Sequence, residues 1–160
     1  MKETNTVYLG LGTNTGDKRE NLTRAIEKLS LVLGCCKKVS TYIETEPWGF
    51  ESDNRFLNCV AVFETDREPM QVLEITEETE RELGRIEKSA NGIYHDRIID
   101  IDILLYNSVV LETPRLTIPH PLMHKRDFVL FPLCEIAPEA THPVLGKTIL
   151  QLTVALKKGL

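Results

Sequence analysis

Hydrophobic and polar positions along the chain recur with two different periods. Apolar residues recur with helical spacing in two segments, one beginning after Asp17 and one after Pro69. Asp17 and Glu20 together resemble a capping box, and Gly34 and Gly84 suit the ends of the two helices. Four other runs are alternating or continuously apolar, which is typical of strands: 7–11, 39–46, 56–65 and 97–106. The order strand–helix–strand–strand–helix–strand predicts an α+β, ferredoxin-like (split β-α-β) fold, with two helices covering one face of an antiparallel sheet.

Weaker patterns follow the fourth strand. Asn107-Ser108 predicts a tight turn into a short returning strand at 109–111, and helical spacing recurs around 122–128 and 148–157. No repeat, low-complexity tract or linker divides the sequence. We therefore expect a single domain over 1–160.

The run RIIDIDILLY, 97–106, carries two carboxylates in an otherwise apolar strand. Alternation predicts that Asp100 and Asp102 share one face with Ile98, Leu104 and Tyr106, and that the other face carries Ile99, Ile101, Ile103 and Leu105. Two carboxylates with Cβ atoms roughly 6.5–7 Å apart repel each other unless a cation lies between them. Because an isolated D-x-D is more often a solvated edge than a metal site, other parts of the chain must decide.

Composition narrows the function classes. With 160 residues, 42% of them hydrophobic and 27% charged, the chain is typical of a globular domain, and its net charge of −5 argues against binding nucleic acid. The sequence lacks a signal-peptide pattern and a transmembrane-length segment, so we expect a cytoplasmic protein without a membrane partner. The cysteines have neither zinc nor disulfide spacing, and we expect buried thiols at Cys35, Cys36, Cys59 and Cys134.

The glycine-rich stretch GLGTNTG, 10–16, follows a strand and precedes a helix. Its spacing differs from that of the dinucleotide-binding fingerprint, and it lacks the lysine of a P-loop. We interpret it as a tight turn.

Charged residues gather in three further places. Glu77 and Glu80 share a face of the second helix, and Arg85 and Arg97 bracket a polar, glycine-containing loop. After the fourth strand, a stiff Pro-His-Pro segment precedes the cluster His124, Lys125 and Arg126. The spacing of His120 and His124 could suit zinc, but no third ligand follows at a recognisable distance, so we favour a phosphate-facing cluster. Carboxylates that hold Mg²⁺, with arginines and a histidine around them, are typical of phosphoryl transfer.

Several motifs, in order along nearly the whole chain, resemble the 6-hydroxymethyl-7,8-dihydropterin pyrophosphokinase family of the folate pathway. They are YLGLGTNTGD, TEPWG, FLNCV, LGR at 83–85, RIIDIDILLY, LTIPHP and RDFVLFPLCEIAP. The resemblance implies a ferredoxin-like fold and transfer of pyrophosphate from ATP to the hydroxymethyl group of the pterin, leaving AMP. ATP and 6-hydroxymethyl-7,8-dihydropterin are thus the expected partners, and we expect a monomer.

The resemblance also implies roles for individual residues. Asp100 and Asp102 resemble the pair that binds two Mg²⁺ ions, and Arg85 and Arg97 match the catalytic arginines. The implied nucleotide contacts are Glu77, Glu80, Arg85, Tyr94, Arg97, Ile103, Thr117, His120 and Arg126. The implied pterin pocket, in which two rings sandwich the heterocycle and an amide reads its polar edge, consists of Thr45, Trp48, Phe56, Asn58 and Phe128.

The chain departs from the family pattern at four positions. Tyr94 stands in place of an expected Trp, Glu77 in place of Gln, Glu87 in place of a second loop Arg, and Pro121 in place of an aromatic residue. These departures concern nucleotide affinity and loop contacts rather than the reaction.

The residues by themselves leave other classes open. Hydrophobic-Asp-hydrophobic-Asp also marks nucleotidyltransferases, which place Gly-Ser at a helix start before the pair, where this chain has Asn91-Gly92 in an expected loop. D-x-D also marks metal-dependent sugar transferases. A ferredoxin-like regulatory module for small ligands would need no metal, and would leave the neighbouring carboxylates unexplained.

Overall fold

The computed structural model describes residues 4–45, 55–84 and 98–159. Its main sheet is antiparallel and has the order β2-β4-β1-β5, with β3 also paired to β4. The strands are β1 (Asn5–Thr13), β2 (Cys35–Val39), β3 (Ile43–Thr45), β4 (Phe56–Thr65) and β5 (Asp100–Tyr106). This order confirms the predicted α+β, ferredoxin-like fold, because the first strand lies between the third and fourth strands of the split β-α-β unit.

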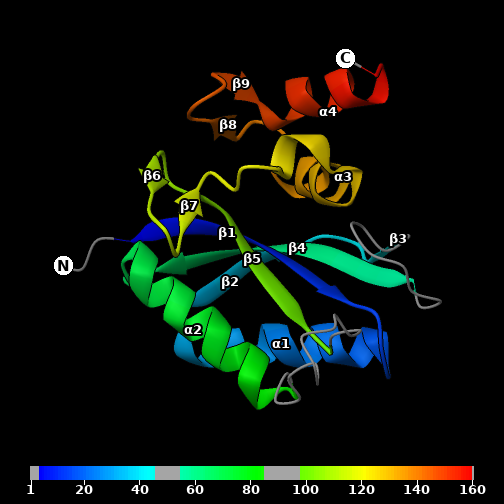
Figure 1. The fold of residues 1–160 in the computed structure, drawn as a ribbon, viewed down its shortest axis with the longest axis vertical. Coiled ribbons are helices and arrows are strands. Elements are labelled where there is room, and N and C mark those ends of the chain that lie inside the picture. Colours follow the sequence, from blue (N-terminus) through cyan, green and yellow to red (C-terminus); the bar gives the residue numbers. More distant parts are fainter. Residues whose placement is uncertain (1–3, 46–54, 85–97, 160) are drawn as a thin grey trace.

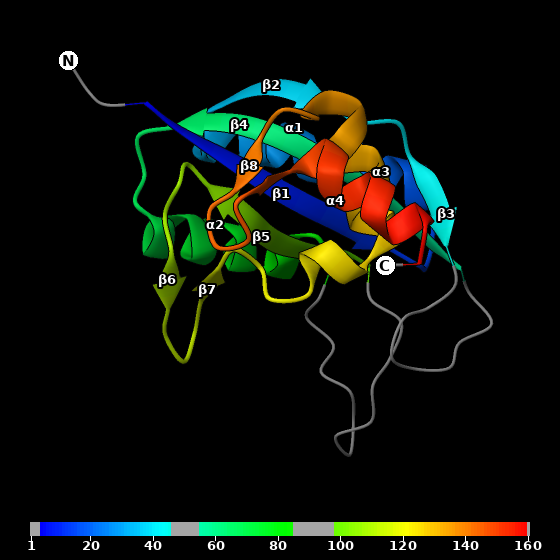
Figure 2. The ribbon, with the colours of Figure 1, turned by 90° about the horizontal axis from the view of Figure 1, so that it is seen from above.

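Helices lie on both faces of the sheet (Figures 1 and 2). One face carries α1 (Lys18–Val32) and α2 (Pro69–Glu82), as predicted, and the Asp17 side chain caps α1 by accepting the N–H of Glu20. The other face carries α3 (Asp127–Ile136) and α4 (Ile149–Lys157). The helix expected at 122–128 is instead a short 3₁₀ turn, η2 (Met123–Lys125), followed by α3.

Two hydrophobic clusters fill the spaces between the layers. Buried residues on the α1/α2 face include Leu9, Leu22, Phe63 and Val72. Those on the α3/α4 face include Val60, Leu104, Met123, Leu130 and Ile149. Only one of the four expected buried thiols is confirmed, since Cys59 is buried, Cys36 and Cys134 are half-buried and Cys35 is exposed.

The predicted alternation in β5 holds from Ile99 to Leu104 and then fails. The register between β1 and β5 shifts between Tyr8 and Leu9, so that Leu9 pairs with Ile103 but Tyr8 pairs with Leu105. Leu105 consequently packs beside Leu104 in the α3/α4 cluster, and Tyr106 packs in the α1/α2 cluster. A β-bulge explains the difference, because an extra residue in one strand reverses the faces that follow.

The strand predicted at 39–46 is confirmed only in part: Val39 ends β2, residues 43–45 form β3, and the two strands pair with different parts of β4. Between them, Ser40 donates its N–H to Val60 O, and its hydroxyl accepts the N–H of Val60, both at 2.9 Å. Thr41 donates its N–H and its hydroxyl to the Glu135 carboxylate on α3. The polar residues between β2 and β3 thus supply hydrogen-bond partners for the backbone of β4 and link this segment to α3.

Short strands form outside the main sheet. The returning strand expected at 109–111 is β6 (Leu111–Glu112), which pairs with β7 (Thr117–Ile118) and not with β5. A second pair consists of β8 (Thr141–His142) and β9 (Lys147–Thr148). No helix in the described part of the chain is both long and apolar enough to cross a membrane.

Candidate active site

The sheet register brings residues from three strands into one row. Gly12 of β1 is the Cα partner of Asn58 on β4 and of Asp100 on β5, and Gly10 is the partner of Asp102. Residues directly opposite each other in a sheet face the same way, so Asn58, Asp100 and Asp102 share the face that carries α3 and α4. Two strand spacings place the backbones of Asn58 and Asp100 about 10 Å apart across β1.

The first two glycines of GLGTNTG lie inside β1, so the interpretation of the whole stretch as a turn is wrong for them. Gly16, with φ +69°, does adopt the left-handed conformation expected of a turn. A Cβ on Gly12 would lie 2.8 Å from Asn58 Oδ1, whereas one on Gly10 would touch Leu104 at an ordinary 3.5 Å. A glycine inside a strand is a sequence signal for a close approach of another group, here the Asn58 side chain to the backbone of Gly12.

Asn58 is fixed by a neighbour from β3. Its amide nitrogen Nδ2 donates to Thr45 Oγ1 at 2.8 Å, and the residue is only 5% exposed. Phe56 lies two residues earlier on the same strand and therefore on the same face. The structure thus brings together three of the predicted pterin-pocket residues.

Arg126 connects the carboxylates to the aromatic residue of α3. Its Nη1 lies 4.0 Å from Asp102 Oδ2, and its guanidinium carbon lies 5.5 Å from the centre of the Phe128 ring. Burial lowers the pKa of Arg126, whereas Asp102 and Asp100 raise it. An arginine remains protonated after such a shift, so the site keeps a cation beside its carboxylates.

His120 lies in the same electrostatic environment. Burial, followed by the charge of Arg126, lowers its pKa to about 4, and Asp100 opposes this shift. The ring Nδ1 of His120 accepts the N–H of Leu122 at 3.1 Å. The backbone N–H of His120 donates to Leu104 O on β5. At neutral pH the imidazole is therefore uncharged with its proton on Nε2, which makes Nε2 a hydrogen-bond donor.

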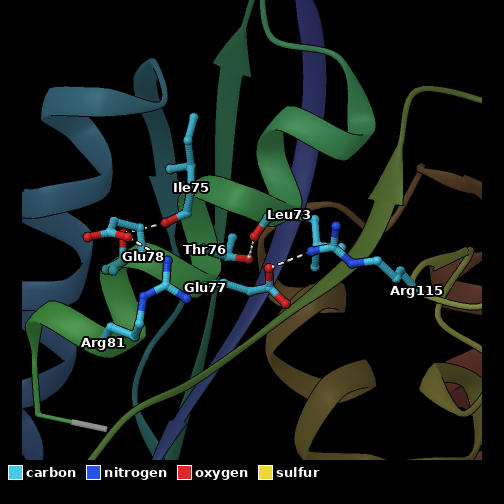
Figure 3. Close-up of polar contacts among 8 residues, drawn as sticks. Leu73, Ile75, Thr76, Glu77, Glu78, Arg81 and Arg115 are labelled. Carbon is cyan, nitrogen blue, oxygen red and sulfur yellow. Dashed lines mark hydrogen bonds and ion pairs between the residues drawn. The ribbon is translucent and has the colours of Figure 1, made fainter. Parts of the chain in front are cut away.

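Two acidic residues of α2 that were predicted to contact the nucleotide bind groups of the protein itself. Glu77 Oε1 accepts from Arg115 Nη2 at 2.9 Å, an ion pair that joins α2 to the turn between β6 and β7 (Figure 3). Glu80 is 3% exposed, and its Oε2 accepts the N–H of Ile101 on β5 at 2.8 Å. Arg115 was not singled out from the sequence, because no motif marks a lone arginine between two short strands.

Ile103 and Thr117 were predicted to contact the nucleotide. The side chain of Ile103 is buried in the α1/α2 cluster, which leaves its backbone for such a contact. Since the N–H of Ile101 points to Glu80, away from β1, that of Ile103 points to the same outer edge of β5. Thr117 is half-buried in β7. Both assignments remain predictions.

Other predicted residues lie outside the described ranges: Trp48, Arg85, Glu87, Tyr94 and Arg97. Among the described residues, no group of three or more His, Cys, Asp or Glu side chains could hold a metal ion by itself. Asp100 and Asp102 nevertheless suit Mg²⁺, which is commonly bound by one or two carboxylates together with substrate phosphates.

Comparison with known proteins decides the family. Residues 8–138 match the model of the 7,8-dihydro-6-hydroxymethylpterin-pyrophosphokinase (HPPK) family. The chain belongs to this family. This membership confirms the expected activity: the HPPK chain is a pyrophosphokinase of folate biosynthesis.

Two bacterial relatives cover most of the chain. It is 49% identical to 2-amino-4-hydroxy-6-hydroxymethyldihydropteridine pyrophosphokinase of Porphyromonas gingivalis over 133 residues, which is 82% of this chain and 90% of the relative. It is 44% identical to the Aquifex aeolicus protein of the same name over 144 residues, or 90% of this chain and 88% of the relative.

A solved structure supports the fold. The chain is similar to Plasmodium falciparum HPPK-DHPS, wild type with pteroate, with a TM-score of 0.75 and 18% identity. The match covers 99% of this chain but only 46% of the Plasmodium chain. At this identity the likeness establishes the HPPK fold alone.

Proposed function

We propose that Asp100 and Asp102 hold two Mg²⁺ ions together with ATP, while the pterin lies beside Asn58 at the other end of the same row. The observation that carries this proposal is the register that sets Asn58, Gly12 and Asp100 opposite one another on neighbouring strands. Gly12 has no side chain to separate the amide from the carboxylates. A substrate bound on this face can therefore reach from Asn58 to the carboxylate pair.

Donor chemistry supports the metal assignment. Asp100 and Asp102 supply carboxylate oxygens two residues apart on one strand face, as hard ligands for a hard cation. Asp100 and Asp102 would hold the Mg²⁺, which would supply positive charge against the phosphate groups. Arg126, whose guanidinium lies close to Asp102, would bind phosphate oxygens as well.

His120 would act as a neutral donor. Its Nδ1 is occupied by the N–H of Leu122, so Nε2–H remains for a phosphate oxygen. Because the imidazole is uncharged at neutral pH, this contact orients the nucleotide rather than adding a second positive charge beside Arg126.

The pterin pocket would combine stacking with an amide. Phe56 and Phe128 are the proposed rings for the two faces of the heterocycle, and Asn58 is the proposed group for its polar edge. The Thr45 hydroxyl oxygen accepts an N–H of the Asn58 amide, so the orientation of that amide is set before a ligand binds. Arg85, Arg97, Tyr94 and Trp48 remain predictions from the family resemblance.

The decisive experiment is incubation with ATP, Mg²⁺ and 6-hydroxymethyl-7,8-dihydropterin, with chromatographic separation of the nucleotides. AMP should form only when all three are present, and EDTA should abolish it. Formation of ADP, or of AMP at the same rate without the pterin, would contradict the proposal.

A further inference from the structure

The amide of Asn58 is held between two neighbours. On one side its Nδ2 donates to Thr45 Oγ1 at 2.8 Å. On the other side, a Cβ built on Gly12 would lie 2.8 Å from Asn58 Oδ1 and 3.5 Å from Phe56 Cδ1. Real Cβ atoms do not approach an oxygen at 2.8 Å, so a side chain at position 12 would force the amide to move.

Backbone conformation does not explain the glycine. Gly12 lies in the extended strand β1, paired on both sides, where an alanine could adopt the same dihedral angles. Glycine usually weakens a strand because it has more conformational freedom to lose. What requires glycine here is therefore the space beside Asn58.

We propose that Gly12 determines pterin specificity, because its missing side chain lets the Asn58 amide keep the orientation that reads the heterocycle. This inference rests on the proposed function, in which Asn58 faces the pterin. Gly12 acts through Asn58 and is a positioning residue. Asn58 cannot evade an added methyl group by rotating without losing the bond to Thr45, and β4 cannot withdraw without breaking its pairing with β1.

Gly10 provides a matched control on the same strand and face. The three atoms nearest to a Cβ there would all belong to the Leu104 side chain, at 3.5 Å or more, which is ordinary van der Waals contact. Gly10→Ala and Gly12→Ala thus add the same methyl group two residues apart, and only the second reaches the amide.

The test measures affinity by calorimetric titration with pterin, with lumazine (the same ring system with an oxo group in place of the amino group) and with an ATP analogue plus Mg²⁺. Displacing a buried polar contact costs about 1–3 kcal/mol, so Gly12→Ala should weaken pterin binding by roughly 5-fold to 140-fold. The ratio of pterin to lumazine affinity should fall, while affinity for the ATP analogue stays within about twofold. Gly10→Ala should keep the parent's affinities and their ratio.

Two results would overturn the inference or its basis, and they can be told apart. If the parent prefers pterin and Asn58→Leu loses it, but Gly12→Ala retains both affinity and preference, the role of Gly12 is wrong. If Asn58→Leu binds pterin like the parent, the proposed pocket itself is wrong.

A second variant covers the case in which Gly12→Ala does not fold. Gly12→Ala/Asn58→Ala lacks the oxygen that the new methyl group would strike, so it should fold with a melting temperature close to that of Asn58→Ala. Failure of the double variant to recover would show that Asn58 is not the group that requires glycine, and would refute the inference.

Discussion

At Asp100 and Asp102, carboxylates occupy alternate positions of a strand whose other face is buried in the core. Ile101 and Ile103 are 6% and 5% exposed, so β5 cannot rotate to separate the two charges. Arg126 lies beside Asp102 and opposes part of the repulsion. The pair is thus held close together by packing on the opposite face of the sheet.

This arrangement predicts opposite effects on activity and stability. Asp100→Asn or Asp102→Asn should abolish most turnover, since an amide is a poor ligand for Mg²⁺. The free energy of unfolding should hold or rise, because repulsion between like charges is relieved. Steady-state AMP production and urea denaturation test the two halves; near-parent activity in both variants would refute the metal assignment.

In the proposed pocket, the Asn58 side chain of β4 would read the polar edge of the pterin. Asn58→Leu, similar in size, should lose pterin binding while ATP binding is kept, because a ligand's polar edge would face an apolar group. Phe128→Ala should weaken pterin binding without changing which heterocycles bind. Stacking contributes about 1 kcal/mol of binding free energy but does not distinguish the polar groups on the ring edge. Calorimetric titration of both variants with pterin and with an ATP analogue checks this prediction, and near-parent pterin affinity in Asn58→Leu would contradict it.

Among the elements, α2 is joined to the outer edge of β5 by Glu80. Its carboxylate accepts the N–H of Ile101, a group that has no strand partner on that side of the described sheet. Glu78, two residues earlier, is exposed and pairs with Arg81 on the surface of the same helix (Figure 3). Removing the Glu80 carboxylate would therefore leave a buried N–H without this acceptor, whereas removing the Glu78 carboxylate would affect only an exposed ion pair.

Glu80→Ala should lower the free energy of unfolding by about 1–3 kcal/mol, because it leaves a buried N–H without its acceptor. Glu78→Ala should change it by less than about 1 kcal/mol, since exposed ion pairs contribute little. Urea denaturation measures both, and hydrogen exchange at Ile101 should accelerate in Glu80→Ala alone. Equal destabilisation by the two variants would argue against the edge role of Glu80.

The β8-β9 hairpin contains a titratable acceptor. His142 Nδ1 accepts the N–H groups of Val144 at 3.3 Å and Leu145 at 3.1 Å, and its ring packs edge-on against His124. Burial, followed by His124, lowers the pKa of His142 below its ordinary 6.5. The unfolded chain therefore takes up this proton at a higher pH than the folded protein does.

His142 should contribute stability in full above about pH 6.5 and progressively less as the pH falls through its folded pKa. His142→Asn retains an oxygen acceptor in a similar position but cannot titrate. Its free energy of unfolding should fall less between pH 7 and pH 5 than that of the parent. Parallel losses in urea titrations of the two proteins would contradict the assignment.

Across the whole molecule, the sheet lies between two helix layers (Figures 1 and 2) and separates two hydrophobic cores. The candidate site lies at one end of its strands. Thr13 ends β1, and Asp100 and Phe56 begin β5 and β4, so the antiparallel order brings these ends together. Cys59, next to Asn58, points to the opposite face and is 1% exposed, and burial raises its pKa to about 12. Its thiol can report how the central strand opens.

Cys59 should resist alkylation until the whole sheet unfolds, because it is buried in the middle of the sheet and protonated at ordinary pH. Cys35 is exposed and should react rapidly under the same conditions. Brief treatment with iodoacetamide at pH 8, followed by peptide mass spectrometry, distinguishes the two thiols. Modification of Cys59 as fast as Cys35 would show that β4 opens locally.

Local patterns in the sequence were sufficient for the elements and for the family. Alternation identified β4 with its observed bounds, helical spacing identified α1, α2 and α4, and motif order identified HPPK. These features depend on neighbouring residues or on short motifs, which a linear reading contains.

The tertiary structure decided what depends on pairing between distant segments. Only the register of β1 with β4 and β5 shows that Gly12 lies between Asn58 and Asp100, and only the β-bulge shows where alternation in β5 reverses. The partners Arg115 for Glu77 and Ile101 for Glu80 are likewise far away in sequence. Such contacts are set by how sheet and helices pack, and no local period in the sequence encodes them.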